Sequence, residues 1–368
     1  MPLLKGQVLW QGTLRSGTVE FSEKISGFAS SGSPQTSAPY ILPGFIDVHV
    51  HGGGSADTMD GADGVKTLAA FHVEHGTTSL FPTTITNPWD AILKALKGIK
   101  EVIEENSLNL PSILGAHLEG PFISPERLGA QPPNTLVPTA ESLETLLSLD
   151  VIKLATLAPE LPASTLAIEA FSRADVRVSF GHSVASYEET LQALKHSDKP
   201  IGFTHLFNAM GGLMGRAPGL VGAAFAHQET YAELILDLEH VHLASFLAAH
   251  HAKPDKLVLV TDAIRAAGTS EGESELGGQT VYIQDGRAKL ADGTLAGSLL
   301  TLDKAFQNAV NSGLSIADAS RLVSHNPANY MGLSDRGELA EAKRADIVVL
   351  DNDFKVLEVY VAGRKLVG

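Results

Sequence analysis

The sequence has no cysteine among its 368 residues. Disulfides and thiolate metal sites are therefore excluded, and any metal must be bound by nitrogen and oxygen ligands. Basic residues are also scarce, because 27 Lys and Arg face 42 Asp and Glu and leave a formal net charge of -15. We expect a chain this acidic to bind neither nucleic acid nor an anionic membrane. An anionic substrate would have to be bound by local Arg or His side chains.

Long apolar runs are missing as well. No window of the sequence offers the ~18 uninterrupted apolar residues of a membrane span. The first stretch, MPLLKGQVLWQG, lacks the apolar segment of a signal peptide. We therefore expect a cytoplasmic protein. Hydrophobic residues make up 44% of the chain and charged residues 19%, which is typical of a globular protein with a substantial core.

The middle of the chain repeats one pattern between Gly44 and Thr261: a short apolar run, a polar or Gly/Pro cluster, and a longer stretch with helical spacing. The eight apolar runs are GFIDVHV, TTSLFPT, SILGAHL, VIKLATL, VRVSFGH, IGFTHLF, AELILDL and KLVLVTD. Such near-continuous hydrophobicity is typical of parallel strands buried on both faces. Helical candidates between them include 89–105, 139–148 and 186–195. The alternation predicts a (β/α)8 TIM-like barrel and leaves a doubly wound sheet as the alternative.

The two ends of the chain differ from the middle. Residues 1–42 and 336–368 hold short alternating segments and tight turns, which are typical of strands. The simplest interpretation pairs both ends in one small β domain beside a barrel of residues 43–335. A further hairpin is predicted after the eighth run, where QTVYIQDGRAKLADGTLAGS carries two Asp-Gly turn signals.

Polar residues gather at the ends of the predicted strands. In a barrel these ends share one face, and catalytic groups come from several of them. The first run ends in His49 and His51, which the two-residue period of a strand points in the same direction. The other strand-end candidates are His117, Glu119, His182, His205 and Asp262.

Each of these residues has an ordinary structural interpretation when it is taken alone. A strand-end His is more often hydrogen-bonded than metal-bound, Asp262 can cap the following helix, and Glu119 can be a turn carboxylate. Four or more N and O ligands on one rim, with a carboxylate left over, are hard to produce by chance. Imidazole and carboxylate suit Zn²⁺ or Fe²⁺, and such a site with open positions activates water for hydrolysis.

The motifs resemble those of the amidohydrolase superfamily and, within it, of the N-acetylglucosamine-6-phosphate deacetylase family. From about residue 41 to the end they run in family order: PGFIDVHVHG, HLEGPF, GHS, THLFNAM, GRAPGLVGAAF, LVTDA, LAGSLLTLDKAF and NPA followed by RGELAEAKRADIVVLD. HLEGPF together with THLFNAM is specific to this branch, whereas the His-x-His pair indicates only the superfamily.

This resemblance implies a (β/α)8 barrel with a small β-sandwich built from both termini, working as a homodimer. It implies that Glu119, His182 and His205 bind the principal metal. Some members carry a second metal on the strand-one pair, and this chain keeps His49 and His51. We therefore expect one or two Zn or Fe ions, with two favoured and Glu119 bridging them.

The resemblance also implies the reaction, which is hydrolysis of the N-acetyl group of N-acetylglucosamine 6-phosphate to glucosamine 6-phosphate and acetate. Asp262 matches the catalytic acid/base that works with metal-activated water. The positions that match contacts to the sugar phosphate and N-acetyl group are Asn208, Ala209, Arg216 and His240, with His242 as the alternative to His240. Which subunit supplies Arg216 to a given site stays open. The chain departs from the family at Gln131, which stands where a substrate-contacting His is usual and never carries a charge.

Three alternatives remain. The Gln131 change keeps a deacetylase for the galactosamine isomer open. Another metal amidohydrolase, such as a cyclic amidase or a deaminase, is the second; cyclic amidases often carry a metal-bridging carboxylated Lys on strand four, and Lys153 stands too early in that strand. A non-enzymatic scaffold that kept the fold is the third, and the complete ligand set argues against it.

Overall fold

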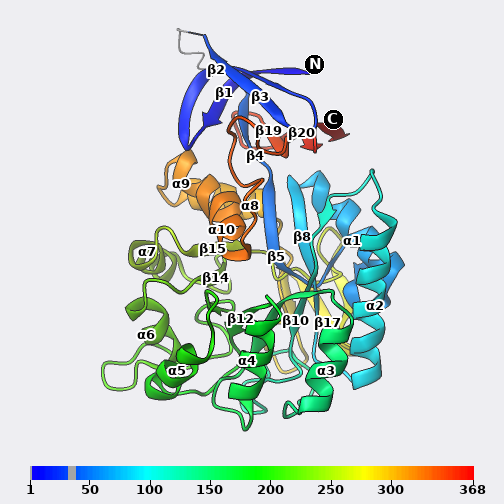
Figure 1. Cartoon of the computed structure of the whole chain (residues 1–368), viewed down its shortest axis with the longest axis vertical. Coiled ribbons are helices and arrows are strands. Elements are labelled where there is room, and N and C mark those ends of the chain that lie inside the picture. The colour runs from blue at the N-terminus through cyan, green and yellow to red at the C-terminus, as the bar shows by residue number, and fades with distance from the viewer. Residues whose placement is uncertain (1, 32–38) are drawn as a thin grey trace.

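The computed structural model describes residues 2–31 and 39–368. Figure 1 shows a body of strands surrounded by helices, with a small β-rich part at one end. Both chain termini lie in that small part (Figure 1).

Eight parallel strands form the wall of the barrel in the described part of the chain. They are β5 (Phe45–Val50), β8 (Thr77–Thr84), β10 (Ala116–Glu119), β11 (Ile152–Leu157), β12 (Arg177–Phe180), β13 (Gly202–Phe203), β14 (Ala232–Ile235) and β15 (Leu257–Val260). Six pair in the order β13-β12-β11-β10-β8-β5, and β14 pairs with β15. Backbone hydrogen bonds from Phe203 to Tyr231 (3.0 Å) and from Asp262 to His49 (2.9 Å) join these two groups and close the ring. The barrel prediction is confirmed, and the doubly wound alternative is wrong.

Helices cover the outside of this ring and explain why the strands are apolar on both faces. After the strands come α1 (Ala62–Glu74), α2 (Trp89–Glu105), α3 (Ala140–Ser148), α4 (Ser164–Arg173), α5 (Tyr187–Ala193), α6 (Gly219–Ala226), α7 (Leu243–Ala252) and α8 (Leu302–Asn311), then α9 (Ile316–Ser320) and α10 (Asn326–Met331). Helix α2 buries Ile92, Leu96 and Ile99 at helical spacing. Among the described residues, no helix is both long enough and apolar enough to cross a bilayer.

The three helices expected by range are present, with small shifts at their ends. The range 89–105 is α2 itself. Residues Thr139 and Ser186 are the N-caps of α3 and α5, and each accepts a hydrogen bond from the third helical residue. Helix α5 ends at Ala193 and continues as a 3₁₀ turn, Leu194–His196.

The chain ends build one seven-stranded sheet. Its strands are β1 (Leu3–Trp10), β2 (Thr13–Phe21), β3 (Ile25–Ser30), β4 (Tyr40–Pro43), β19 (Ile347–Leu350), β20 (Val356–Val361) and β21 (Arg364–Val367), in the order β21-β20-β19-β4-β1-β2-β3. One face encloses its own apolar cluster, which includes Trp10, Phe21 and Ile347. Alternate residues such as Val348 and Val359 join the barrel core instead. The prediction of a β-rich domain from both termini is confirmed, and the sheet face that carries Val348 and Val359 attaches it to the barrel.

After the eighth barrel strand comes a three-stranded antiparallel sheet, which includes the predicted hairpin. It contains β16 (Gly272–Leu276), β17 (Gln279–Gln284) and β18 (Arg287–Lys289). Its β17–β18 turn is Asp285-Gly286, with φ of 51° and 71°, as the Asp-Gly signal requires. Leu276 and Val281 pack with Ile85 and Ile264 in a small apolar cluster, so the hairpin is fixed to the rim beside the strand ends.

Candidate metal centre

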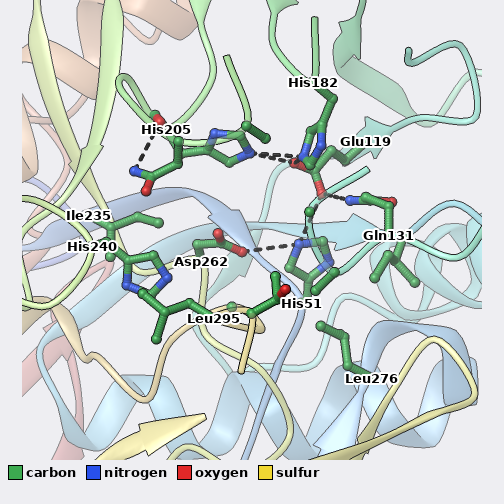
Figure 2. Close-up of a pocket in the computed structure, with 17 residues that line it drawn as sticks. His51, Glu119, Gln131, His182, His205, Ile235, His240, Asp262, Leu276 and Leu295 are labelled. Carbon is green, nitrogen blue, oxygen red and sulfur yellow. Dashed lines mark hydrogen bonds and ion pairs between the residues drawn. The ribbon is translucent and has the colours of Figure 1, made fainter. Parts of the chain in front are cut away.

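The candidate residues share one position, at or just past the carboxyl end of a barrel strand (Figure 2). His51 follows β5 directly, and Glu119 is the last residue of β10. The other three each stand two residues past a strand end: His182 after β12, His205 after β13 and Asp262 after β15. The rim predicted from the sequence therefore exists, and these side chains meet there.

Three of these residues have positive φ angles, which direct their side chains toward the centre. His182, His205 and Asp262 have φ of 49°, 31° and 47°, a region that costs a non-glycine residue about 1 kcal/mol or more. Around Asp262 the strain is balanced by backbone hydrogen bonds to His49 O and from Ser298 N, both 2.9 Å. Gly297 allows the second bond: its φ is 58°, and a Cβ there would lie 2.4 Å from the Ile264 side chain.

The glycines after His51, like Gly297, permit a close approach of two backbone segments. Gly52 pairs with Asp57 in a two-strand ribbon, β6 (Gly52–Gly53) with β7 (Ala56–Asp57), and donates a 2.8 Å hydrogen bond to Ala263 O. A Cβ on Gly52 would lie 2.5 Å from the Arg265 backbone nitrogen. The close approach lets the segment after strand one pack on the segment that carries Asp262.

One group of ligand atoms, which we call the principal corner, consists of Glu119 Oε1, His182 Nε2 and His205 Nε2. The carboxylate oxygen lies 3.2 Å from each nitrogen, and the two nitrogens lie 3.0 Å apart. All three residues are buried. Figure 2 shows the two rings and the carboxylate converging from different strands.

A second group, the histidine-pair corner, consists of His49 Nε2, His51 Nε2, Glu119 Oε2 and Asp262 Oδ1. The two nitrogens are 3.3 Å apart. His51 Nε2 lies 3.2 Å from Glu119 Oε2 and 3.2 Å from Asp262 Oδ1, and His49 Nε2 lies 3.6 Å from Asp262 Oδ1. His49 Nε2 also lies 3.5 Å from Glu119 Oε1, the oxygen of the principal corner, so the two corners share the Glu119 carboxylate.

Both corners have the dimensions of a metal site. Tetrahedral Zn²⁺ with bonds of ~2.0–2.1 Å has ligand atoms about 3.3 Å apart. The separations in the two corners run from 3.0 to 3.6 Å. Imidazole nitrogens and carboxylate oxygens suit Zn²⁺ and Fe²⁺ alike. The residues present therefore fit a divalent cation at either corner.

Contacts at the far side of the rings set which nitrogen faces each corner. Nδ1 of His182 donates to Arg127 O at 2.8 Å, and Nδ1 of His51 donates to Thr83 O at 3.2 Å. Since each acceptor is an oxygen, Nδ1 carries a proton, and Nε2 is the nitrogen that would bind a cation at the corner. His205 Nδ1 has no hydrogen-bond partner among residues 2–31 and 39–368.

His49 has a charged partner that the sequence analysis missed. Its Nδ1 lies 3.0 Å from Glu233 Oε2, and both side chains are fully buried. Glu233 interrupts the apolar run AELILDL of β14. An acid inside a short strand buried along its whole length is the signal that could have identified it.

His117, the seventh strand-end candidate, does not face either corner. Its Nε2 lies 2.7 Å from Thr156 Oγ1, and its Nδ1 lies 3.1 Å from Val48 O. Burial holds the pKa of His117 well below its usual range, so the ring is neutral. It packs edge-on against His49, with ring centroids 4.6 Å apart, and so limits the rotation of that ligand.

The imidazole rings and carboxylates of the centre strongly shift one another's pKa values. Burial alone would lower the pKa of His51, but the carboxylates of Asp262 and Glu119 raise it to about 9. Burial alone would raise the pKa of Asp262, but the His49 and His51 rings hold it at about 2. The buried carboxylates are thus ionised and matched by imidazole protons, which a divalent cation displaces on binding.

Gln131 lines the site but also contacts Glu119. Its Nε2 donates to Glu119 Oε2 at 2.5 Å, while its Oε1 accepts from Thr86 N at 2.8 Å. The amide thus fixes the carboxylate oxygen that belongs to the histidine-pair corner (Figure 2). Its predicted contact with substrate stays a prediction.

Three of the other predicted substrate residues line a cavity of about 250 Å³ above the centre: Asn208, Ala209 and His240. Apolar side chains close its sides: Ile85, Ile235, Leu276 and Leu295. Arg216 does not line this cavity and is exposed on its loop. His242, the alternative to His240, instead caps α7 by accepting from Ala244 N.

His240 is positioned as a cation. Its Nδ1 lies 2.6 Å from Asp237 Oδ2. Burial alone would lower the pKa of His240, but the Asp237 carboxylate raises it above its usual range. An imidazolium at the cavity wall is suited to an anionic group, which the overall charge of the protein would otherwise repel.

Comparison with known proteins identifies the family. The sequence pattern of the Amidohydrolase family matches residues 40–366. This chain belongs to that family.

Individual members of the Amidohydrolase family are similar over most of their length. An N-acetylglucosamine-6-phosphate deacetylase of Lysinibacillus sphaericus is 37% identical over 334 residues, which cover 89% of this chain and 86% of the relative. An N-acetylgalactosamine-6-phosphate deacetylase of Escherichia coli O157:H7 is 35% identical over 337 residues, covering 90% and 88%. A crystallised variant of the Mycobacterium smegmatis N-acetyl-D-glucosamine-6-phosphate deacetylase, in complex with N-acetyl-D-glucosamine-6-phosphate, superimposes with a TM-score of 0.93 at 31% identity and covers 100% of this chain and 99% of its own.

Proposed function

We propose that this protein is a metal-dependent deacetylase that hydrolyses N-acetylglucosamine 6-phosphate to glucosamine 6-phosphate and acetate. The observation that carries the proposal is the position of Asp262. Its ionised carboxylate lines the same cavity as the principal corner and lies 3.2 Å from His51 of the other corner. The names of the relatives at 35–37% identity support the same substrate class.

A bound divalent cation supplies Lewis acidity, which lowers the pKa of water and polarises a carbonyl group. Asp262, whose pKa the His49 and His51 rings hold at about 2, is ionised at neutral pH and accepts the proton of the attacking water. The same side chain then delivers that proton to the amine, which leaves poorly unless it is protonated. His240, charged through Asp237, binds the phosphate group of the substrate.

We propose that two ions bind, because both corners have suitable dimensions and share Glu119. Zn²⁺ and Fe²⁺ both suit the nitrogen and oxygen donors. The carboxylated-lysine arrangement of cyclic amidases finds no support: Lys153 near the start of β11 is directed at Asp150, 3.5 Å away, and its side chain is 41% exposed.

The galactosamine isomer is the second candidate substrate. The relative named for that isomer and the presence of Gln131 in the cavity favour keeping it. Parallel measurements of acetate release from the two N-acetylhexosamine 6-phosphates and their unphosphorylated forms test both proposals. We expect kcat/KM to be highest for a phosphorylated sugar. A preference for an unphosphorylated sugar contradicts the role of His240, and absence of acetate release contradicts the proposed function.

We also propose a homodimer in which Arg216 serves the site of the partner subunit. The support is its exposure, outside its own cavity, on a loop that also exposes Leu213 (56%) and Met214 (66%). Light scattering of the purified chain, with KM of the Arg216→Ala variant, tests this. A monomer with full affinity for the phosphorylated sugar contradicts it.

A further inference from the structure

Glu233 is a buried acid outside both corners. It lies in the middle of β14 and is fully buried. Its Oε2 contacts His49 Nδ1 at 3.0 Å, and its Oε1 has no hydrogen-bond partner in the described ranges 2–31 and 39–368. An ionised carboxylate in such surroundings costs several kcal/mol unless it is paired. The partner that offsets this cost is His49.

The contact fixes the ring of His49. A carboxylate only accepts hydrogen bonds from the ring, so Nδ1 carries a proton and Nε2 is the nitrogen available to a cation at the histidine-pair corner. The edge of His117, with its ring centroid 4.6 Å from that of His49, packs against the same ring. His49 does not line the cavity, so neither it nor Glu233 contacts a substrate there.

The other rings have weaker support. Nδ1 of His51 and of His182 donate to neutral backbone carbonyls, and His205 Nδ1 has no described partner. Among the four ligand rings described here, the charged acceptor therefore belongs to His49 alone. Its negative charge lies next to the histidine-pair corner and attracts a cation there, whereas no carboxylate of residues 2–31 or 39–368 bonds to Nδ1 of His182 or His205.

We propose that Glu233 is a positioning residue that sets the affinity of the histidine-pair corner for its cation, and thereby whether the centre holds one ion or two. This inference rests on the two-ion part of the proposed function. It assigns no step of the reaction to Glu233. Outer carboxylates of this kind typically change metal affinity by about 10- to 100-fold.

The test is a zinc-binding isotherm for the purified full-length chain. Wild type, Glu233→Gln and Glu233→Ala are equilibrated with buffered free Zn²⁺, and bound zinc per chain is measured by mass spectrometry. We expect the second ion to bind about 10-fold more weakly in Glu233→Gln, which keeps an acceptor but loses the charge, and about 100-fold more weakly in Glu233→Ala. The first ion should bind as in wild type.

Asp303→Asn is the matched control, because it changes another buried carboxylate that contacts a histidine Nδ1, that of His75 at 3.3 Å, and neither residue belongs to a corner. It should change neither isotherm step. First-ion affinity and melting temperature report whether each variant is folded. Because Gln is isosteric with Glu, the Glu233→Gln variant alone tests the inference if Glu233→Ala does not fold.

A Glu233→Gln chain that binds its second ion as tightly as wild type overturns the inference. Equal weakening of both ions also overturns it, because the effect would then be general. A wild type that binds only one ion removes the two-ion proposal and this inference together, while acetate release by that one-ion protein would leave the deacetylase proposal standing.

Discussion

The two corners of the centre share a carboxylate but are built differently. The principal corner takes two rings from loops after β12 and β13, and their far sides meet a neutral backbone carbonyl or no described group. The histidine-pair corner takes its rings from the end of β5, deeper in the barrel, and is surrounded by the carboxylates of Glu233 and Asp262. We therefore propose that the principal corner binds a cation mainly through ligand geometry at the rim, and that buried charge contributes more at the histidine-pair corner.

Glu119→Gln should have the largest effect, because it weakens both corners at once. We expect loss of bound metal and a fall in kcat/KM of at least about 10³-fold, since Lewis-acid stabilisation is worth several kcal/mol. Bound metal and acetate release are measured together. The control is Glu126→Gln, an exposed acid on the following loop, which should behave as wild type. A Glu119→Gln chain with full metal content contradicts the shared-carboxylate geometry.

Asp262→Asn should come next and separate chemistry from binding. The amide cannot accept the water proton, so kcat should fall about 10²- to 10⁴-fold. The principal corner does not include Asp262, so at least one ion per chain should remain. Full turnover in this variant would contradict the assignment of Asp262 as the acid/base.

His49→Asn and His182→Asn compare the corners directly. His182→Asn should lose the principal ion and nearly all activity. His49→Asn should keep one ion and lose activity by roughly 10- to 100-fold, because only the histidine-pair corner is damaged. Metal stoichiometry and kcat of both variants are measured side by side; the opposite ranking would show that the two corners had been assigned the wrong way round.

Gln131→Leu should have the smallest effect and act on one corner. It removes the 2.5 Å hydrogen bond to Glu119 Oε2, and a bond to a charged acceptor is worth about 1.5–3 kcal/mol. We expect weaker zinc binding at the histidine-pair corner by about 10-fold, with the principal ion retained. Zinc isotherms check this, and an unchanged second step would mean that the contact does not orient Glu119.

Much of this centre could be predicted from the sequence, because its candidate residues stand at the strand ends, where barrel geometry brings side chains together. A strand places His49 and His51 on one side, and their Nε2 atoms indeed lie 3.3 Å apart. Strand ends share a rim, so His182, His205 and Asp262 meet Glu119 although they are far apart in the chain.

The sequence could not predict contacts that depend on no particular residue type. Thr83 O and Arg127 O are backbone carbonyls, which every residue carries, so only the fold can single them out as ring partners. Gln131 was expected at the substrate, and its bond to Glu119 depends on where the loop after β10 turns back. The exposed position of Arg216 likewise depends on the tertiary structure of its loop.

Crystals grown with Zn²⁺ and measured at the zinc absorption edge test the two-corner centre most directly. The account predicts two anomalous peaks about 3.5–4 Å apart, one among Glu119, His182 and His205 and the other between His49 and His51. A single peak, or no peak within either corner, would contradict it.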